Sequence, residues 1–82
     1  MDVIDKNAAD AFALYNLGAR LFGLKQFAKA EESFKNALSA VPSFLPAQAS
    51  LAEIYMIKGR FDEALQISAQ VLEAKNISLN YN

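Results

Sequence analysis

The hydrophobic and polar positions of the chain recur with helical spacing in four successive stretches. No stretch shows the strict alternation of a half-buried strand, and Ala, Leu, Glu, Lys and Gln are common throughout, which favours helices. Turn residues interrupt the pattern near Gly23, at Pro42 and Pro46, at Gly59 and at Asn76. The sequence therefore predicts an all-α chain of antiparallel helix–turn–helix units, with helices near residues 8–24, 27–40, 45–58 and 61–74.

A shift of 34 residues brings the two halves of this pattern into register. The turns near Gly23 and at Gly59 then fall at nearly the same place in each half. The identical residues that the shift superposes are Ala13 with Ala47, Leu17 with Leu51, Phe27 with Phe61, Ala30 with Ala64, Leu38 with Leu72 and Ala40 with Ala74. Such internal repetition indicates one helical hairpin stacked twice.

These repeated positions resemble the tetratricopeptide repeat family, whose pattern runs from an aromatic residue through Leu-Gly, Tyr, Ala, an aromatic residue and Ala to a closing Pro. The first repeat, 11–44, carries the pattern in register at Leu14, Leu17, Gly18, Leu21, Ala30, Phe34, Ala37 and Pro42. The second, 45–78, keeps Leu51, Ala52, Tyr55, Gly59, Phe61, Ala64 and Leu72, whereas Gln48, Ser68 and Asn76 replace two aromatic residues and the proline. The resemblance implies a short α-solenoid with a lead-in at 1–10 and a polar tail at 79–82.

The core of each hairpin is predicted from its apolar spacing. In the first helix an apolar stripe recurs at i, i+3, i+4 and i+7; it consists of Leu14, Leu17, Gly18 and Leu21. Small residues let neighbouring helices approach closely, and we expect Phe27, Phe34 and Phe61 to fill the space between them. The second helix is amphipathic, and its predicted solvent-facing residues are Lys29, Glu32, Lys35, Asn36 and Ser39.

The first helix of each repeat has more apolar residues than one buried stripe accounts for. In the tetratricopeptide family these helices line the concave face, so the resemblance implies a partner-binding groove there. Its candidate residues are Phe12, Tyr15, Asn16, Ala19, Phe22, Ala49, Ser50, Glu53, Met56 and Ile57. Family members often use an Asn such as Asn16 to bond the backbone of a bound peptide; the alternative is an Asn bonded to water or to a neighbouring turn.

Three interpretations of the surplus apolar residues Phe12, Tyr15, Phe22, Met56 and Ile57 remain open at the level of sequence. They pack within the chain, under residues 1–10 or the segment 77–81; they line a groove for another polypeptide; or they mediate self-association. Some family members grip a C-terminal carboxylate with Lys and Asn, but Tyr15 and Ala19 stand at the matching positions. A groove would therefore suit an apolar peptide or an amphipathic helix of a partner protein. Arg20 and Glu53 add charges that set specificity or form solvated pairs.

The end of the last hairpin is also apolar. Ile67, Val71, Leu72 and Ile54 are predicted to face that end, where terminal repeats of solenoids normally present a polar surface. This indicates either a fragment of a longer repeat protein or a self-assembling scaffold. A self-complementary contact would close as a dimer, and a head-to-tail contact would extend as a fibre.

The composition of the chain argues against several classes of partner and location. Eight basic and nine acidic residues give a formal charge of −1 without any run of like charges, so we expect neither nucleic acid nor an anionic membrane as a partner. No stretch approaches the roughly 20 apolar residues that cross a bilayer, so we expect no direct membrane insertion. The N-terminus lacks the basic and apolar regions of a secretory signal, and we expect a cytoplasmic protein.

Catalytic chemistry has little basis in this sequence. The chain contains no His and no Cys, which are the commonest general base and the strongest nucleophile. The acidic pairs Glu31-Glu32 and Asp62-Glu63 are predicted to lie in the first turns of helices, where carboxylates favour the helix dipole. We therefore expect a protein that is not an enzyme and uses no metal or cofactor.

Overall fold

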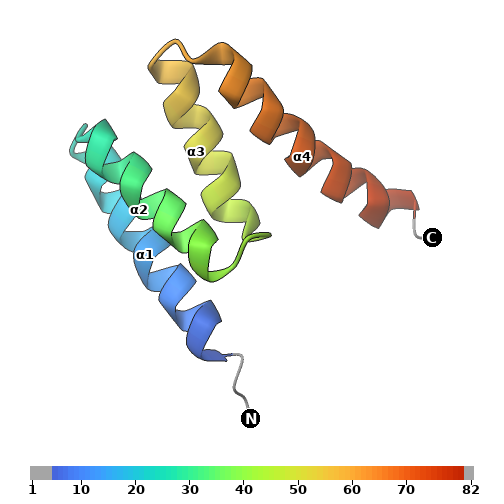
Figure 1. The fold of residues 1–82 in the computed structure, drawn as a ribbon, viewed down its shortest axis with the longest axis horizontal. Coiled ribbons are helices and arrows are strands. Elements are labelled where there is room, and N and C mark those ends of the chain that lie inside the picture. Colours follow the sequence, from blue (N-terminus) through green and yellow to red (C-terminus); the bar gives the residue numbers. More distant parts are fainter. Residues whose placement is uncertain (1–4, 81–82) are drawn as a thin grey trace.

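The computed structural model describes the backbone of residues 5–80 and the side chains of residues 6–73. It contains four helices: α1 (Asp5–Gly23), α2 (Phe27–Ala40), α3 (Leu45–Ile57) and α4 (Phe61–Asn80) (Figure 1). The predicted all-α architecture is confirmed, with each helix where the sequence places it. α1 begins somewhat earlier than predicted.

α4 extends further than predicted. It ends at Asn80 rather than near residue 74, so the predicted break at Asn76 is wrong. Asn lowers helix stability by only a fraction of a kcal/mol relative to Ala, unlike Pro, which costs about 3 kcal/mol. The Ala, Lys and Leu residues around Asn76 favour continuation of the helix.

The two hairpin turns share one backbone geometry. In the first, the N–H of Gln26 donates to the Leu21 carbonyl at 2.9 Å; in the second, the N–H of Arg60 donates to the Tyr55 carbonyl at 2.8 Å. The left-handed residue is Lys25 in the first turn, with φ 63°, and Gly59 in the second, with φ 79°. These positions are related by the 34-residue shift, which supports the assignment of two equivalent hairpins.

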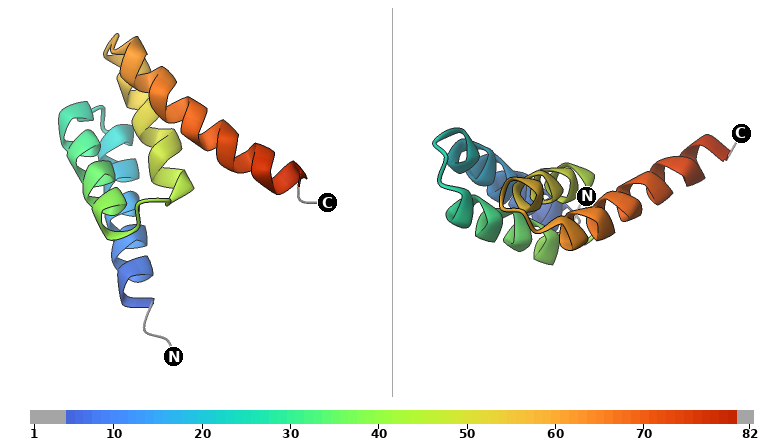
Figure 2. Two further views of the ribbon diagram at one scale, coloured as in Figure 1. Left: turned by 45° about the vertical axis from the view of Figure 1, so that its right-hand side comes forward. Right: turned by 90° about the horizontal axis from the view of Figure 1, so that it is seen from above.

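The hairpins stack so that the first helices α1 and α3 form one layer and the second helices α2 and α4 form the other (Figure 2, right). α1 packs along α2, α3 packs along α4, and α2 contacts α3 across the junction between repeats. α1 and α2 lie side by side along their length, whereas α3 and α4 diverge away from their shared turn (Figures 1 and 2). The first hairpin is closed and the second is splayed.

The core lies between the two hairpins. Phe34 and Ile54 are the largest fully buried side chains, and the predicted small residues Ala30, Ala37 and Ala64 are buried beside them. Gly18 is required by close packing, because a Cβ built at this position would lie 2.6 Å from Cε1 of Phe34. The five predicted solvent-facing residues of α2 are exposed.

Three packing predictions are wrong. Leu17 is 48% exposed, because no helix of the described residues covers its side of α1. Phe61 is 60% exposed: its counterpart Phe27 is covered by the Phe22 ring at 5.3 Å, but Met56 replaces that ring in the second hairpin. Ile54 does not face the end of the stack; it is fully buried because it lies on the side of α3 that packs against α2.

Candidate protein-interaction surface

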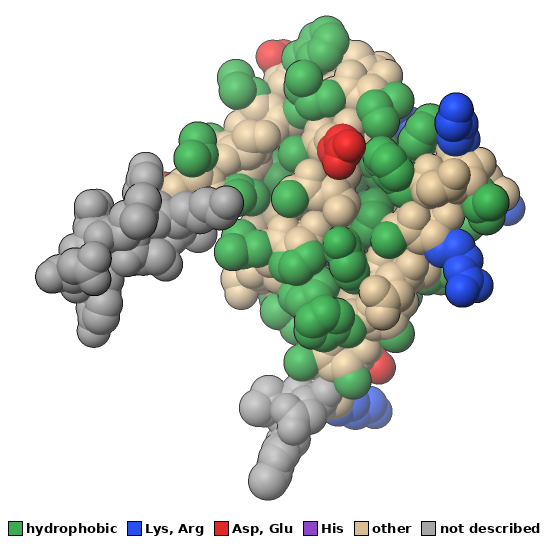
Figure 3. Space-filling model, turned by 180° about the vertical axis from the view of Figure 1, so that it is seen from behind, with side chains coloured by type: hydrophobic (Ala, Val, Ile, Leu, Met, Phe, Trp, Pro, Cys, Tyr) green, Lys and Arg blue, Asp and Glu red, His purple; other side chains and the backbone are tan. Residues whose placement is uncertain are grey.

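The ten candidate residues lie on the two first helices, on what we call the α1–α3 face. Figure 3 shows this side of the molecule, with hydrophobic side chains spread over it, an acidic side chain near the middle and basic side chains along one edge. Exposed apolar atoms gathered in this way mark a candidate surface for contact with another macromolecule.

An aromatic cluster forms the start of the face on α1. Phe12 is 53% exposed and meets the ring of Phe44 edge-on, with centroids 5.0 Å apart. Tyr15 is half-buried between Phe44 at 5.9 Å and Phe34 at 5.8 Å. Sequence analysis missed Phe44, which lies in the link between the hairpins. Its signal was an aromatic residue set between Pro42 and Pro46, where a polar turn would be ordinary.

The remaining α1 candidates differ in accessibility. Phe22 is half-buried against Phe27 and the core. Ala19 is exposed on the face. Asn16 is exposed at the edge of the face, where it lines an open depression of about 260 Å³ together with Ala13, Leu17 and Arg20. Asn16 therefore points partly toward the flank of α1.

The α3 candidates form a continuous strip. Ala49, Glu53 and Ile57 follow one another at i, i+4 and i+8, a spacing that places them on one side of the helix. Ala49 and Glu53 are exposed, Ser50 is half-buried, and Met56 and Ile57 are 55% and 50% exposed. Ala49 also lines an apolar hollow of about 290 Å³ between α3 and α4, together with Ala52, Ser68, Val71 and Leu72.

These positions divide the surplus apolar residues in two. Tyr15 and Phe22 pack within the chain, against Phe27, Phe34 and Phe44. Phe12, Met56 and Ile57 remain at least half exposed. The sequence analysis also allowed the surplus apolar residues to pack under the two ends of the chain. Of these ends, residues 1–4 and the side chains of 74–82 lie outside the described residues.

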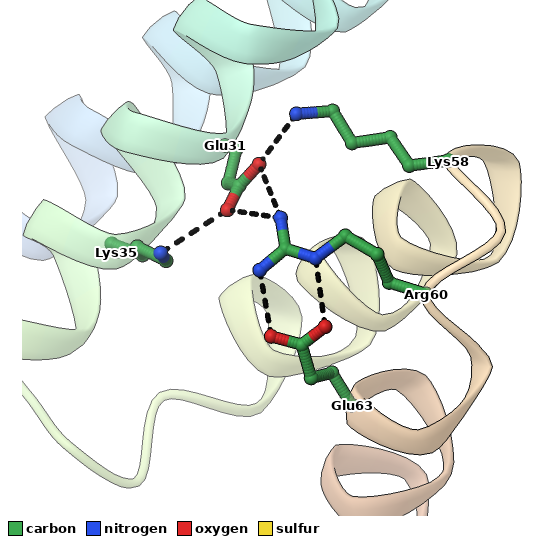
Figure 4. Close-up of polar contacts among 5 residues, drawn as sticks. All are labelled: Glu31, Lys35, Lys58, Arg60 and Glu63. Carbon is green, nitrogen blue, oxygen red and sulfur yellow. Dashed lines mark hydrogen bonds and ion pairs between the residues drawn. The ribbon is translucent and has the colours of Figure 1, made fainter.

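An ion-pair cluster joins the two repeats on the opposite layer (Figure 4). The Glu31 carboxylate of α2 accepts hydrogen bonds from Lys58 Nζ at 2.8 Å and from an Arg60 guanidinium nitrogen at 3.1 Å, and Lys35 Nζ lies 3.1 Å away. Arg60 also makes a bidentate pair with Glu63 at 2.6 and 2.7 Å. The Arg60 guanidinium lies 4.4 Å from the centroid of the Tyr55 ring.

The Glu31 carboxyl is strongly biased toward its charged form. Burial raises its pKa, but the hydrogen bonds and charges of Lys58 and Lys35 outweigh this effect and lower the pKa from 4.5 to about 2. The hydrogen bond to Glu31 raises the pKa of Lys35, and the hydrogen bond from Arg60 lowers the pKa of Glu63. The cluster therefore acts as a charged clasp across the repeat junction.

The placement of the acidic pairs was only half correct. Asp62 and Glu63 lie in the first turn of α4, but the first turn of α2 holds no acidic residue, and Glu31 lies beyond it. The i, i+4 spacing of Glu31 and Lys35 was visible in the sequence. The pairing with Lys58 and Arg60 was not, because it depends on how the hairpins stack.

Within residues 6–73 no three acidic side chains gather closely enough to hold a metal ion. None of the helices in the described part of the chain has the length and apolar character needed to cross a bilayer.

Two stacked antiparallel hairpins, related by a fixed sequence offset, define an α-helical repeat protein. The family model described as Tetratricopeptide repeat matches residues 21–76, which is more than half of the chain. The chain belongs to the tetratricopeptide repeat family. Neither the curated proteins nor the solved structures gave a match. Members of this family are generally protein–protein interaction modules and are typically non-catalytic.

Proposed function

We propose that the protein binds a segment of another protein on the α1–α3 face. The observation that carries this proposal is the exposure of Phe12, Met56 and Ile57 on the first helices of both hairpins, each with about half of its surface open to water. Burying such side chains in a complex contributes roughly 1.5–3 kcal/mol each when burial is complete. Family membership supports the same class of function.

The chemistry of the face favours an apolar peptide or an amphipathic helix. Phe12 and Phe44 offer a ring pair at one end, and Met56 offers a flexible side chain that adapts to different shapes. Ala19 and Ala49 are small and exposed between these anchors, so a partner backbone can approach closely there.

Charge adds a second element of recognition. Glu53 is exposed between Ala49 and Ile57 on the α3 strip. A basic side chain next to the apolar anchors of the partner would pair with it at the surface. Such exposed pairs contribute only about 0–1 kcal/mol, so Glu53 would select among apolar segments rather than provide most of the affinity.

The test is a selection of random peptides displayed on phage against the intact chain, followed by affinity measurements on variants. Ile57→Asp and Met56→Asp are expected to weaken the selected peptides at least about tenfold, the loss of one buried anchor. Leu65→Asp is the matched control, because Leu65 is 70% exposed on α4, outside the face. Phe22 is unsuitable for substitution since it packs on the core.

The proposal fails if no peptide is selected, or if peptides bind the Met56 and Ile57 variants as tightly as the unaltered chain. Glu53→Lys should change the preferred charge in the selected peptides from basic to acidic while their apolar anchors stay the same. Circular dichroism of each variant establishes that the helices persist.

A further inference from the structure

Equivalent positions of the two repeats are buried to different extents, and the difference follows one side of the stack. Ala47, Leu51 and Ile54 on α3 are almost completely buried, at 0%, 3% and 0% exposed, where α3 meets α2. The 34-residue shift maps this stripe, with Lys58, onto Ala13, Leu17 and Arg20 of α1 and onto Leu24, which directly follows α1. We call these four residues the α1 stripe. All are exposed, Leu17 at 48% and Leu24 at 61%.

The same comparison applies to the second helices. On α2, Glu31 is buried and Leu38 is partly buried where α3 covers them. Their counterparts on α4 are Leu65 and Leu72, which we call the α4 stripe. These residues are 70% and 59% exposed. α4 therefore presents toward solvent the side that α2 presents to α3.

One contact in the α2–α3 junction shows how the two stripes would fit together. Glu31 of α2 pairs with Lys58 of α3 at 2.8 Å across the junction. The shift replaces Glu31 by Leu65 and Lys58 by Leu24. A charged pair at the internal junction thus corresponds to a pair of leucines on the two outer surfaces, and these are the two most exposed large hydrophobic residues of the described chain.

We propose that the α4 stripe of one copy docks on the α1 stripe of a second copy, head to tail, with Leu65 against Leu24. The contact repeats the α2–α3 junction already present within each chain, so its geometry is one that these helices adopt. The hollow lined by Ser68, Val71 and Leu72 lies beside the α4 stripe, and by the same mapping Leu17 of the second copy meets this region.

Two physical consequences distinguish this contact from other associations. Because its two sides are different surfaces, the contact does not close on itself, and association continues beyond a dimer. Because the leucine pair replaces the ion pair, salt should not abolish association, although Arg20 of the α1 stripe adds one charged side chain to the contact. A contact on the α1–α3 face involves other residues and is independent of this proposal.

Sedimentation velocity of the intact chain, from micromolar to millimolar concentration and at low and high salt, is the first measurement. The expected result is a weight-average mass that rises steadily past that of a dimer and still does so at high salt. A chain that stays monomeric at millimolar concentration, or one that stops at a dimer, overturns the proposal. Growth that salt abolishes also overturns it.

A mixing experiment tests the head-to-tail arrangement. Leu24→Lys and Leu65→Glu are each expected to weaken association about tenfold or more, because each alters one side of every contact. An equimolar mixture should regain association, since it supplies unaltered Leu24 for unaltered Leu65 and pairs Lys with Glu at the alternate contact. Mixtures that remain monomeric, or single variants that associate normally, contradict the arrangement.

The matched control is Met56→Lys. Met56 is 55% exposed, as accessible as the altered leucines, but it lies outside both stripes. Its association should equal that of the unaltered chain. All three altered positions are exposed, so the variants should keep their helicity by circular dichroism. Weakened association of the Met56 variant would overturn the assignment to the stripes.

Discussion

The first and second hairpins share a sequence pattern and a turn geometry, but they close to different degrees. In the first, the Phe34 ring fits against Gly18, with no room for a Cβ, and Tyr15 covers the ring at 5.8 Å. The second hairpin has Ser68, Ala52 and Ala49 at the corresponding positions, and these three residues line an open apolar hollow. The Phe34 ring opposite Gly18 closes α1 on α2. In the second hairpin the corresponding residues, Ser68 and Ala52, are both small, and α3 and α4 diverge.

The two hairpins are therefore held in place by different contacts. The closed hairpin contributes Phe34 and its alanine neighbours Ala30 and Ala37 to the buried core. The splayed hairpin holds its place through Ile54 and Tyr55, which pack on α2, and through the charged clasp at Glu31. In the splayed hairpin the buried residues lie mainly on α3, so this hairpin is held chiefly at the junction between repeats.

The largest effect is expected where the closed hairpin is made to resemble the splayed one. Phe34→Ser removes a fully buried ring and should lower the free energy of unfolding by about 3–5 kcal/mol, as ring deletions in cores do. Urea denaturation followed by circular dichroism measures the loss. Ser68→Ala, at the equivalent exposed position, is the control and should change stability little. A small effect of Phe34→Ser would mean that the ring does not organise the core.

Acid should loosen the junction before it affects the closed hairpin. Because the pKa of Glu31 falls from 4.5 to about 2 on folding, the stabilisation is complete above pH 4.5 and is lost as the pH drops from there toward 2. The shift corresponds to up to about 3 kcal/mol. Urea midpoints measured across this range should fall for the unaltered chain and fall less for Glu31→Gln. If the urea midpoints of the two proteins fell in parallel with pH, Glu31 would be excluded as the source of the acid sensitivity.

The limits of sequence analysis follow the same division. Helical periodicity and turn residues indicated the four helices, and the motif indicated the packed positions Gly18, Ala30, Phe34 and Ala37 of the first repeat, because these signals are local. Leu17 was predicted to be buried from a stripe that ignores which neighbour covers it. The exposure of Leu24 and Leu65 and the Glu31 clasp depend on stacking between hairpins, and no local periodicity contains that information.

The accessibility of the candidate residues could be predicted only in part. Exposed positions on α1 and α3 followed from the excess of apolar residues around each first helix. The half-burial of Tyr15 and Phe22 did not, because it requires Phe44 from the link between the hairpins and Phe27 from the start of α2. Aromatic residues in links and at helix starts are therefore the feature to examine first when a groove is predicted from a helical repeat.

The two turns offer a smaller and more symmetrical comparison. Gly59 and Lys25 occupy equivalent left-handed positions, which cost a residue with a side chain roughly 1–2 kcal/mol. Gly59→Ala should therefore destabilise the chain by about 1 kcal/mol, whereas Lys25→Gly should stabilise it by less, since glycine also gains freedom in the unfolded chain. Thermal and urea unfolding of both variants measures whether each change raises or lowers the free energy of unfolding. Effects of equal sign would show that the turns are not equivalent.

The smallest expected effect tests whether the splayed hairpin is underpacked. Ser68→Leu places an apolar side chain in the hollow lined by Ala49, Ala52, Val71 and Leu72, and because the hollow is open, the gain in stability should be only about 0.5–1 kcal/mol, below that of full burial. The measurement belongs in the Leu65→Glu background, where self-association does not contribute. Gln66→Leu, at an exposed position two residues before Ser68, is the control and should gain nothing. If Ser68→Leu destabilises the chain while the control does not, the hollow cannot accept a side chain in place, and the divergence of α3 and α4 is set by the helix backbones rather than by the missing ring.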